Sequence, residues 1–210
     1  GARDAALEGT SDTPETNLSL TSAAITYHLL KNGKSIHNTF IFAPKLESIG
    51  KWYRQLMGES IGKRNDVDGN EVNAGITPIV SIGSTDLHSM AQLYFGGPDD
   101  KITHVVSIKQ DPFHGIPRKV VLPGLVKNIE GKMLTDIMDA ILHGTIETYK
   151  KLERPVVHIE LDAVNEYELG YYLQFRMLEM MYLAKLMNID AFDQPQVELY
   201  KEETRKFLQK

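Results

Sequence analysis

The sequence lacks cysteine altogether and contains a single tryptophan among its 210 residues. The missing cysteines exclude disulfides, thiolate nucleophiles and zinc–thiolate sites, and they are compatible with a reducing compartment. No run approaches the roughly 18 apolar residues that a membrane-spanning helix requires. The segment that begins Gly1-Ala2-Arg3-Asp4 also lacks the charged start and apolar stretch of a signal peptide. We therefore expect a cytoplasmic protein that does not enter a membrane.

Basic residues are also too few to form a positive field. Lysine and arginine number 23 against 28 aspartates and glutamates, which gives a formal net charge of -5. No segment clusters basic residues with interleaved aromatics, so nucleic acid is not expected as a partner. A hydrophobic content of 42% with 24% charged residues is typical of a folded globular protein. We expect one domain over residues 1–210, with a helical lead-in at 1–35 and C-terminal helices at 165–210.

Short apolar stretches alternate with helical patterns along the chain. Apolar residues recur at helical spacing over 18–30, 46–57, 85–93, 133–152 and 165–187, with a terminal helix capped near Asp193. Strands are predicted at 38–43, 76–82, 102–108 and 155–161, a polar loop at 64–74, and a loop around Pro112, Pro117 and Pro123. This alternation predicts an α/β protein, a three-layer α/β/α sandwich whose mostly parallel sheet is covered on both faces. Ligands of such sheets bind beyond the carboxyl ends of the strands.

The first chemical candidate is Glu59, in the stretch Gly58-Glu59-Ser60-Ile61-Gly62-Lys63. It follows the helical pattern at 46–57, and we expect the backbone to turn just beyond it and to aim the carboxylate at a cleft. The stretch is not a phosphate-binding P-loop, because its glycines are too closely spaced and no Ser or Thr follows Lys63. A glutamate at a helix end equally fits a solvated surface charge.

Two further segments supply an imidazole, an amide and an ammonium. His88 follows the hydroxyl-rich turn Gly83-Ser84-Thr85-Asp86, and an imidazole can exchange protons near neutral pH. Gln194 and Lys201 are seven residues apart, so the terminal helix would carry them on one face. Taken singly, His88 also fits a structural role and Lys201 a solvated one.

The remaining histidines do not form a metal site. They lack the spacing of three or four residues that places two ligands on one helix face, so we expect no bound metal. They are His28, His37, His104, His114, His143 and His158. We interpret His104 and His158, inside predicted strands, as hydrogen-bonded core residues. A methionine-rich helix face, formed by Met177, Met180, Met181 and Met187, is interpreted as core or subunit interface.

Taken together, the three segments resemble the glucose-6-phosphate isomerases, specifically their C-terminal half, which is built on the flavodoxin-like sugar isomerase (SIS) fold. The resemblance is carried by residues 52–63, by residues 85–89 with Gln92 and Leu93, and by residues 192–201. It implies the reversible isomerisation of glucose 6-phosphate and fructose 6-phosphate through a cis-enediol intermediate, without metal or organic cofactor.

The resemblance also assigns roles to the candidate residues. Glu59 matches the carboxylate that moves the proton between C1 and C2, and His88 matches the imidazole that opens the sugar ring. Lys201 and Gln194 match residues of the C-terminal pocket, which makes Lys201 a catalytic candidate and Gln194 a substrate-binding one. The family histidine reaches into the neighbouring subunit's site, so a homodimer with a shared active site is implied.

Two departures and one gap qualify the match. Gln196 stands where the family has glycine, and Gly58 where it has alanine; a side chain at position 196 could tilt the terminal helix and displace Lys201. The family's N-terminal half supplies a phosphate-binding loop rich in Ser and Thr and a Gly-Gly-Arg element, and neither occurs in this sequence. We expect the chain to be part of a longer isomerase. Two alternatives stay open, a stand-alone SIS domain that binds a sugar phosphate without catalysis and a purely structural or assembly domain.

Overall fold

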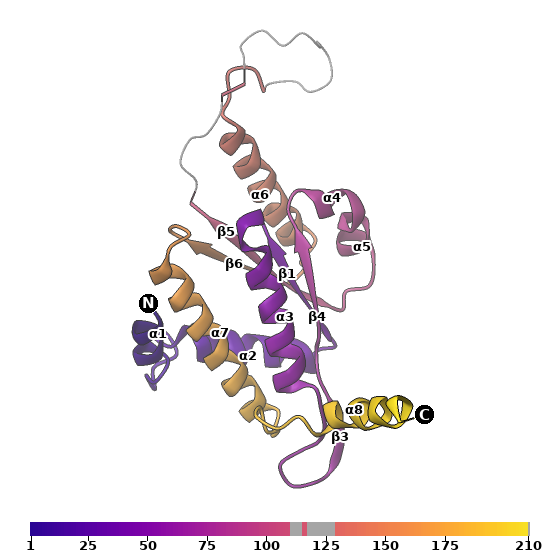
Figure 1. Ribbon diagram of the computed structural model, residues 1–210. Helices are drawn as coiled ribbons and strands as arrows, with labels where there is room; N and C mark the ends of the chain where they lie inside the picture. Colours follow the sequence, from indigo (N-terminus) through magenta and orange to yellow (C-terminus); the bar gives the residue numbers. More distant parts are fainter. Residues whose placement is uncertain (110–114, 117–128, 210) are drawn as a thin grey trace. The chain divides into compact units, whose positions relative to one another are not determined.

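The computed structural model describes residues 1–109, 115–116 and 129–209 (Figure 1). The elements follow in the order α1 (Ala2–Glu8), α2 (Leu18–Lys31), β1 (Ile36–Ile41), the 3-10 turn η1 (Pro44–Leu46), α3 (Glu47–Ile61), β2 (Lys63–Asn65), β3 (Glu71–Ala74), β4 (Thr77–Ile82), α4 (Thr85–Ser89), α5 (Ala91–Gly96), β5 (Lys101–Ile108), α6 (Leu134–Lys151), β6 (Val156–Leu161), α7 (Glu166–Leu186) and α8 (Pro195–Leu208). Pro112, Pro117 and Pro123 of the predicted loop lie outside the described residues.

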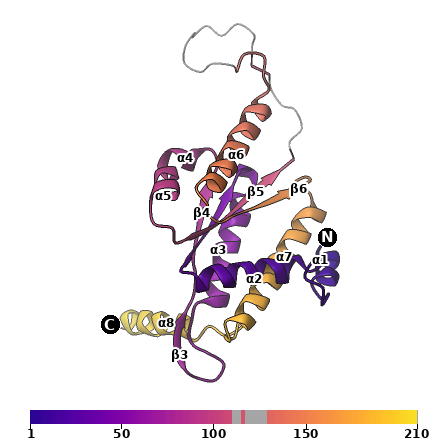
Figure 2. The ribbon, with the colours of Figure 1, turned by 180° about the vertical axis from the view of Figure 1, so that it is seen from behind.

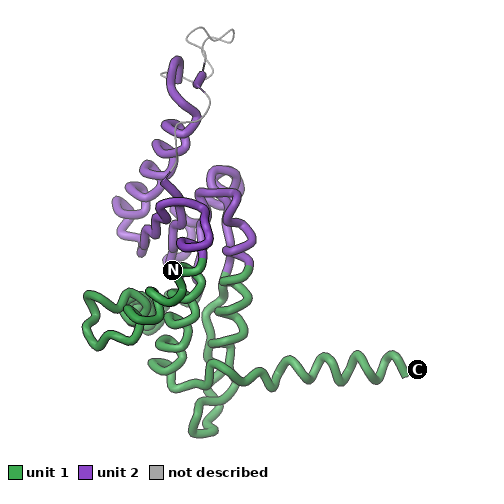
Figure 3. The backbone as a smooth tube through the Cα atoms, turned by 60° about the vertical axis from the view of Figure 1, so that its left-hand side comes forward, with its two compact units in different colours: residues 1–35, 52–78, 170–210 green, residues 36–51, 79–169 purple. Residues whose placement is uncertain are grey.

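The chain divides into two compact units (Figure 3). Unit 1 comprises residues 1–35, 52–78 and 170–210, and unit 2 comprises residues 36–51 and 79–169. The boundaries fall after Ser35, just before β1, and inside three elements: α3 after Lys51, β4 after Pro78, and α7 before Gly170. Each unit has a hydrophobic core of its own, and the single domain expected over residues 1–210 stays a prediction.

Unit 2 contains a four-stranded sheet in the order β4-β1-β5-β6, so that β1 lies between β4 and β5 in both ribbon views (Figures 1 and 2). β1 and β5 are parallel, with Ile36 opposite Lys101 and Ile41 opposite Val106. β5 and β6 are also parallel, and Thr103 lies opposite Val156. All four strands were predicted from short apolar runs, and the mostly parallel sheet is confirmed.

Helices cover both faces of this sheet. On one face Phe40 of β1, Phe42 directly after β1 and Val105 of β5 cluster with apolar side chains of α5 and α6, namely Tyr94, Leu142, Ile146 and Tyr149. On the other face α3 begins close to the strands: a Cβ at Gly50 would lie 3.0 Å from Val80 and 3.2 Å from Ile41. Side chains alternate along a strand, so Phe40 and Ile41 serve opposite faces. The predicted layered α/β arrangement is confirmed.

The core of unit 1 joins α2, α3 and α7. Its buried members include Ala23 of α2, Tyr53, Met57 and Ile61 of α3, and Met180, Leu183 and Ala184 of α7. Of the predicted methionine face, Met180 lies in this core and Met187 packs against it, whereas Met177 and Met181 are exposed. The interpretation as core therefore holds for Met180 and Met187, and a subunit interface at Met177 and Met181 stays a prediction.

Two side-chain caps fix helix starts. The Asn17 Oδ1 atom accepts the Leu20 N–H at 2.9 Å before α2, and its Nδ2 donates to Gly9 O at 3.0 Å and Ser11 O at 2.9 Å. Asn165 accepts the Glu168 N–H at 2.9 Å before α7, which confirms the predicted capping residue. Asn17 is fully buried, so it also ties the loop before α2 to the helix.

The polar loop predicted at 64–74 is wrong, because an antiparallel hairpin of β2 and β3 occupies it. Its turn is closed by Asp66, whose Oδ1 accepts the Asp68 N–H at 3.0 Å and the Asn70 N–H at 2.8 Å. The Val67 N–H donates to Asn188 O at 3.0 Å, which ties the turn to the end of α7. Backbone pairing rather than an apolar pattern specifies these strands.

The single helix predicted at 85–93 is also wrong, since α4 and α5 meet at Met90. The Asp86 carboxylate accepts the Ile82 N–H at 2.7 Å and the Ser89 hydroxyl at 2.8 Å, so it closes α4 as a separate short helix. Within the described residues, no helix combines the length and the apolar character needed to cross a bilayer.

Candidate active site

Glu59 lies in the last turn of α3, which extends to Ile61 and so runs beyond the predicted helix. Its neighbours Ser60 and Ile61 are buried, whereas Glu59 itself is exposed. Gln55, one turn earlier on the same helix face, donates its Nε2–H to Glu59 Oε1 at 3.0 Å. The expected turn follows directly, at Gly62, but the described residues leave the carboxylate in contact with solvent.

Gln194 reaches the same carboxylate from a distant part of the sequence. Its Nε2 donates to Glu59 Oε2 at 3.2 Å, so each carboxylate oxygen accepts a hydrogen bond from a different amide. Gln194 occupies the N-cap position of α8, and Pro195 is the first helical residue. The structure therefore brings together two of the four predicted site residues.

The terminal helix begins beside Asp193 as predicted, with Gln194 at the N-cap, but the N-cap side chain makes no capping hydrogen bond and Asp193 is engaged with Lys63. Lys63 follows the end of α3, and its side chain is only 4% exposed. The Lys63 ammonium lies 3.1 Å from Asp193 Oδ1, donates to Glu59 O at 2.9 Å and also donates to Asp193 O. Sequence reasoning included Lys63 in the stretch around Glu59 but gave it no role; its signal was a Gly-Lys pair directly after a helix end.

Lys201 lies two turns into α8, with its side chain 42% exposed. Its ammonium pairs with Glu198 Oε1 at 2.6 Å, and this hydrogen bond raises the pKa of Lys201 above its usual value. The same hydrogen bond lowers the pKa of the Glu198 carboxyl. Lys201 is a cation near neutral pH, held on the helix that Gln194 caps.

His88 belongs to α4 in unit 2, whereas Glu59, Gln194 and Lys201 belong to unit 1. The imidazole is exposed, and its short helix is anchored through the Asp86 contacts with Ile82 and Ser89. Its ring-opening role stays a prediction.

The two strand histidines differ from each other. His104 is fully buried and its ring lies 4.3 Å from that of His37, centroid to centroid. His158 is exposed, so its interpretation as a core residue is wrong, although it does share a 2.8 Å hydrogen bond with Ser107. Partial burial lowers the pKa of His158.

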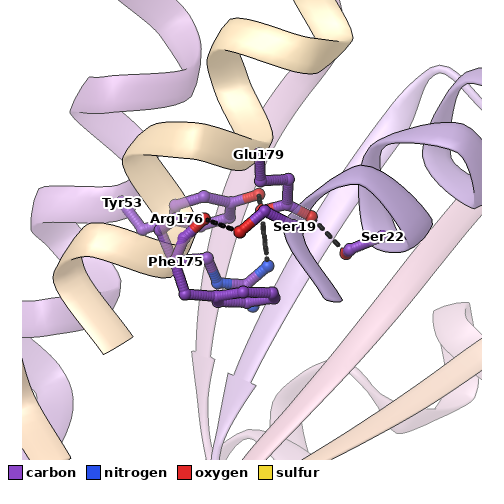
Figure 4. A network of polar contacts seen from close by, with 6 residues as sticks. All are labelled: Ser19, Ser22, Tyr53, Phe175, Arg176 and Glu179. Carbon is purple, nitrogen blue, oxygen red and sulfur yellow. Dashed lines mark hydrogen bonds and ion pairs between the residues drawn. The ribbon is translucent and has the colours of Figure 1, made fainter. Parts of the chain in front are cut away.

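A buried ionic network anchors α3 before the site (Figure 4). Arg176 and Glu179 of α7 are both fully buried and pair at 2.8 Å. The Tyr53 hydroxyl of α3 donates to Glu179 Oε2 at 2.8 Å, and the Ser22 hydroxyl of α2 donates to Glu179 Oε1. The Arg176 guanidinium also lies 4.3 Å from the centre of the Tyr53 ring. One carboxylate thus connects three helices.

The network also shifts the pKa values of its side chains. Burial raises the pKa of Tyr53, and the charge of Glu179 raises it further. For Arg176, burial alone would lower the pKa, but the charge of Glu179 and the neighbouring tyrosines outweigh it and raise the value. Sequence reasoning missed this network, because an arginine in a helical pattern is ordinarily assigned to the solvent side.

A cavity of about 310 Å³ lies beside the site in unit 1. It is lined by Lys63, Arg64, Asn65, Asp66, Val67, Asp190, Asp193, Pro195 and Gln196. Gln196 is exposed and lines this cavity. Helix α8 forms with a glutamine at this position. In the part of the chain that the structure describes, no group of three or more His, Asp or Glu side chains is placed to hold a metal ion.

No family model matches the sequence. Among curated proteins, glucose-6-phosphate isomerase of Carboxydothermus hydrogenoformans is 34% identical over 193 residues, which cover 89% of this chain and 40% of that enzyme. The glucose-6-phosphate isomerase of Methanocaldococcus jannaschii is 31% identical, over 87% of this chain and 43% of that enzyme. This chain is a relative of the glucose-6-phosphate isomerases. It spans about 40% of the length of the curated relatives it matches.

Solved structures agree on the fold. A hypothetical protein from Thermus thermophilus superposes with a TM-score of 0.86 at 29% identity, covering 99% of this chain and 48% of that one. A glucose-6-phosphate isomerase from Chlamydia trachomatis superposes with a TM-score of 0.76 at 20% identity, which bears on the fold alone. Alignment with the isomerases extends along most of the chain, so it includes more than the short motifs around Glu59 and Gln194.

Proposed function

We propose that this chain is the C-terminal part of a glucose-6-phosphate isomerase and that it contributes the proton-transferring carboxylate, Glu59. The main observation behind this proposal is the position of Glu59, whose two carboxylate oxygens accept hydrogen bonds from Gln55 and Gln194. Similarity to isomerases at 34% identity over most of the chain supports the reaction class. The proposed reaction interconverts glucose 6-phosphate and fructose 6-phosphate.

The proposed chemistry needs a base, a fixed geometry and a nearby cation. A Glu59 oxygen takes the proton from the carbon alpha to the substrate carbonyl and returns it to the neighbouring carbon, so no electrons leave the substrate. The two amide donors restrict rotation of the carboxylate and keep it aimed, which lowers the entropy lost on reaching the transition state. Negative charge develops on the enediol oxygens, and we assign its stabilisation to Lys201.

The remaining parts of this proposal concern the exclusion of water, the opening of the sugar ring, cofactors and location. Glu59 is exposed in the described structure, so substrate and the N-terminal half of the isomerase are proposed to exclude water from it. His88 is proposed to open the sugar ring from the neighbouring subunit of a homodimer. The site uses no metal or organic cofactor in this proposal, and the enzyme is placed in the cytoplasm.

The test replaces Glu59 in the complete protein. Glu59→Gln keeps the shape of the side chain but removes its basicity, so we expect kcat to fall by about 10²–10⁴-fold. Glu47→Gln is the matched control, because Glu47 is a carboxylate on the same helix, with its side chain 44% exposed, and it pairs with Lys51 at 2.6 Å. Binding of fructose 6-phosphate should persist in both variants. Turnover near that of the wild type in Glu59→Gln would refute the assignment.

A non-catalytic sugar-phosphate-binding module is the second candidate, favoured by the exposure of Glu59. The two functions differ in the fate of the substrate proton. If the complete protein isomerises glucose 6-phosphate in D₂O, deuterium enters C2 of recovered substrate. Calorimetric binding without deuterium incorporation would favour the binding module instead.

A further inference from the structure

Lys63 connects the two segments that meet at Glu59. Its ammonium carries three N–H donors and has three acceptors around it: Glu59 O, Asp193 O and Asp193 Oδ1. Glu59 O is one of the carbonyls in the last turn of α3, which lack partners within the helix. A cation there also complements the negative end of the helix dipole. Lys63 is therefore the cap of α3 and the anchor of residue 193 at once.

The contacts of Lys63 join the same two segments as the hydrogen bond between the Gln194 and Glu59 side chains. Gln194, whose amide holds the Glu59 carboxylate, directly follows Asp193, whose backbone carbonyl is bonded to Lys63. Two connections thus join the same pair of segments, one through the backbone of Glu59 and one through its carboxylate. The Lys63 ammonium is buried and all three of its N–H groups have acceptors, so it is held in one position. The hydrogen bond from Gln194 to Glu59 is exposed and 3.2 Å long, so it is weaker. The buried link is the one able to fix the geometry of the exposed one.

We infer that Lys63 is a positioning residue that holds the Glu59 carboxylate and the start of α8 in catalytic register, an inference that rests on the proposed isomerase function. Lys63 does not touch the reacting atoms in this account. It sets the separation between Glu59 and Gln194, and through α8 it sets where Lys201 is presented.

The test uses the complete protein with Lys63→Met, which keeps an unbranched apolar stem and removes the ammonium. Lys101→Met is a matched control, because Lys101 is also a buried lysine, 9% exposed, that binds a backbone carbonyl, Pro98 O, at 3.2 Å and the Asp100 carboxylate. A misplaced base should lower kcat by about 10–10²-fold in Lys63→Met. KM should change far less, because Lys63 makes no contact with substrate in this account. The control should keep kcat close to that of the wild type.

A second readout does not depend on activity. Backbone amide exchange, followed by mass spectrometry on the complete protein, should accelerate over residues 193–201 in Lys63→Met and stay unchanged there in Lys101→Met. Asp193→Asn removes only the 3.1 Å ion pair of an aspartate whose side chain is 53% exposed, so it preserves folding and should show the same changes at smaller amplitude.

Each outcome decides one question. Equal losses of kcat in Lys63→Met and Lys101→Met, or unchanged exchange over residues 193–201 in both Lys63→Met and Asp193→Asn, would overturn the positioning role. If Lys63→Met does not fold, Asp193→Asn and its exchange pattern decide alone. If the wild-type complete protein fails to isomerise, the proposed function is lost, and accelerated exchange in Lys63→Met would still establish the link between α3 and α8.

Discussion

Removing the cation from the buried network of unit 1 should destabilise the protein strongly. Arg176→Met would remove the guanidinium that pairs with the fully buried Glu179 carboxylate and leave it the hydroxyl donors of Tyr53 and Ser22. Breaking a buried ion pair by removing one partner typically costs about 3–5 kcal/mol of unfolding free energy. The loss of the guanidinium from the face of Tyr53, 4.3 Å away, places the expected value toward the upper end.

A double variant separates charge from packing. In Arg176→Met with Glu179→Met no charge stays buried, and the remaining defects are the hydroxyls of Tyr53 and Ser22, each worth about 1 kcal/mol. We therefore expect the double variant to be more stable than Arg176→Met alone by about 2 kcal/mol, because the isolated buried charge is gone. Arg205→Met is the surface control: its guanidinium lies 3.9 Å from Glu198 at an exposed site, and its loss should cost less than about 0.5 kcal/mol.

The assay is urea unfolding followed by tryptophan fluorescence. Trp52 is the only tryptophan of the chain, precedes Tyr53 on α3 and packs against the core of unit 1. Its signal therefore reports the unit that contains the network, and linear extrapolation gives the free energy of unfolding. The reasoning is refuted if Arg176→Met costs less than about 1 kcal/mol, or if the double variant loses the sum of the two single effects.

Three smaller predictions concern local structure. Gly58→Ala should stabilise α3 by about 0.5–1 kcal/mol, since a Cβ there meets no atom within 4 Å; an unchanged or lower melting temperature would contradict this. Asn17→Ala should cost about 2–3 kcal/mol in urea unfolding and Asn165→Ala only about 1, because Asn17 is buried and its Nδ2 makes three further hydrogen bonds; equal costs would show that only the cap matters. The hydrogen bond from the Asn70 side chain is the main cause of the lowered pKa of Asp66. The ionised carboxylate therefore stabilises the hairpin fully at pH values above the usual aspartate pKa, and this stabilisation is lost as the pH falls through the lowered pKa. In an NMR titration, Asn70→Ala should return the pKa of Asp66 toward its ordinary value, and an unshifted titration would rule out this cause.

Local sequence patterns predicted the elements that depend on interactions between residues close in the sequence. The strand at 102–108 was placed within one residue of β5, because four of its residues, Ile102, Val105, Val106 and Ile108, are β-branched apolar residues typical of strands. Asn165 was recognised as a cap because its partner, the Glu168 N–H, lies three residues away. The hairpin at 64–74 escaped notice, because it is exposed along most of its length and so carries no apolar alternation.

The site depends on contacts that no local pattern contains. Glu59 and Gln194 are 135 residues apart, and their pairing was expected only from a family resemblance. The burial of Arg176 could not be read from α7 alone, because the Glu179 that pairs with it is also bonded by Ser22, 157 residues away. Lys63 was given no role from the sequence, because its acceptors come from α3 and from residue 193.

The polar contacts of α3 complement its apolar packing in a way that bears on catalysis. Met57 and Ile61 bury the inner face of the helix, but apolar contacts are non-directional and tolerate small rotations and shifts along the axis. Hydrogen bonds are directional, and α3 has them at both ends of its unit 1 segment, through Tyr53 to Glu179 and through Glu59 O to Lys63. Tyr53 and Glu59 are about one and two-thirds turns apart, so fixing the first hydroxyl fixes the direction in which the second side chain leaves the helix. A rotation that the apolar core would tolerate would break these bonds, and this is why Glu59, the proposed base, can be held in one orientation on the exposed side of the helix.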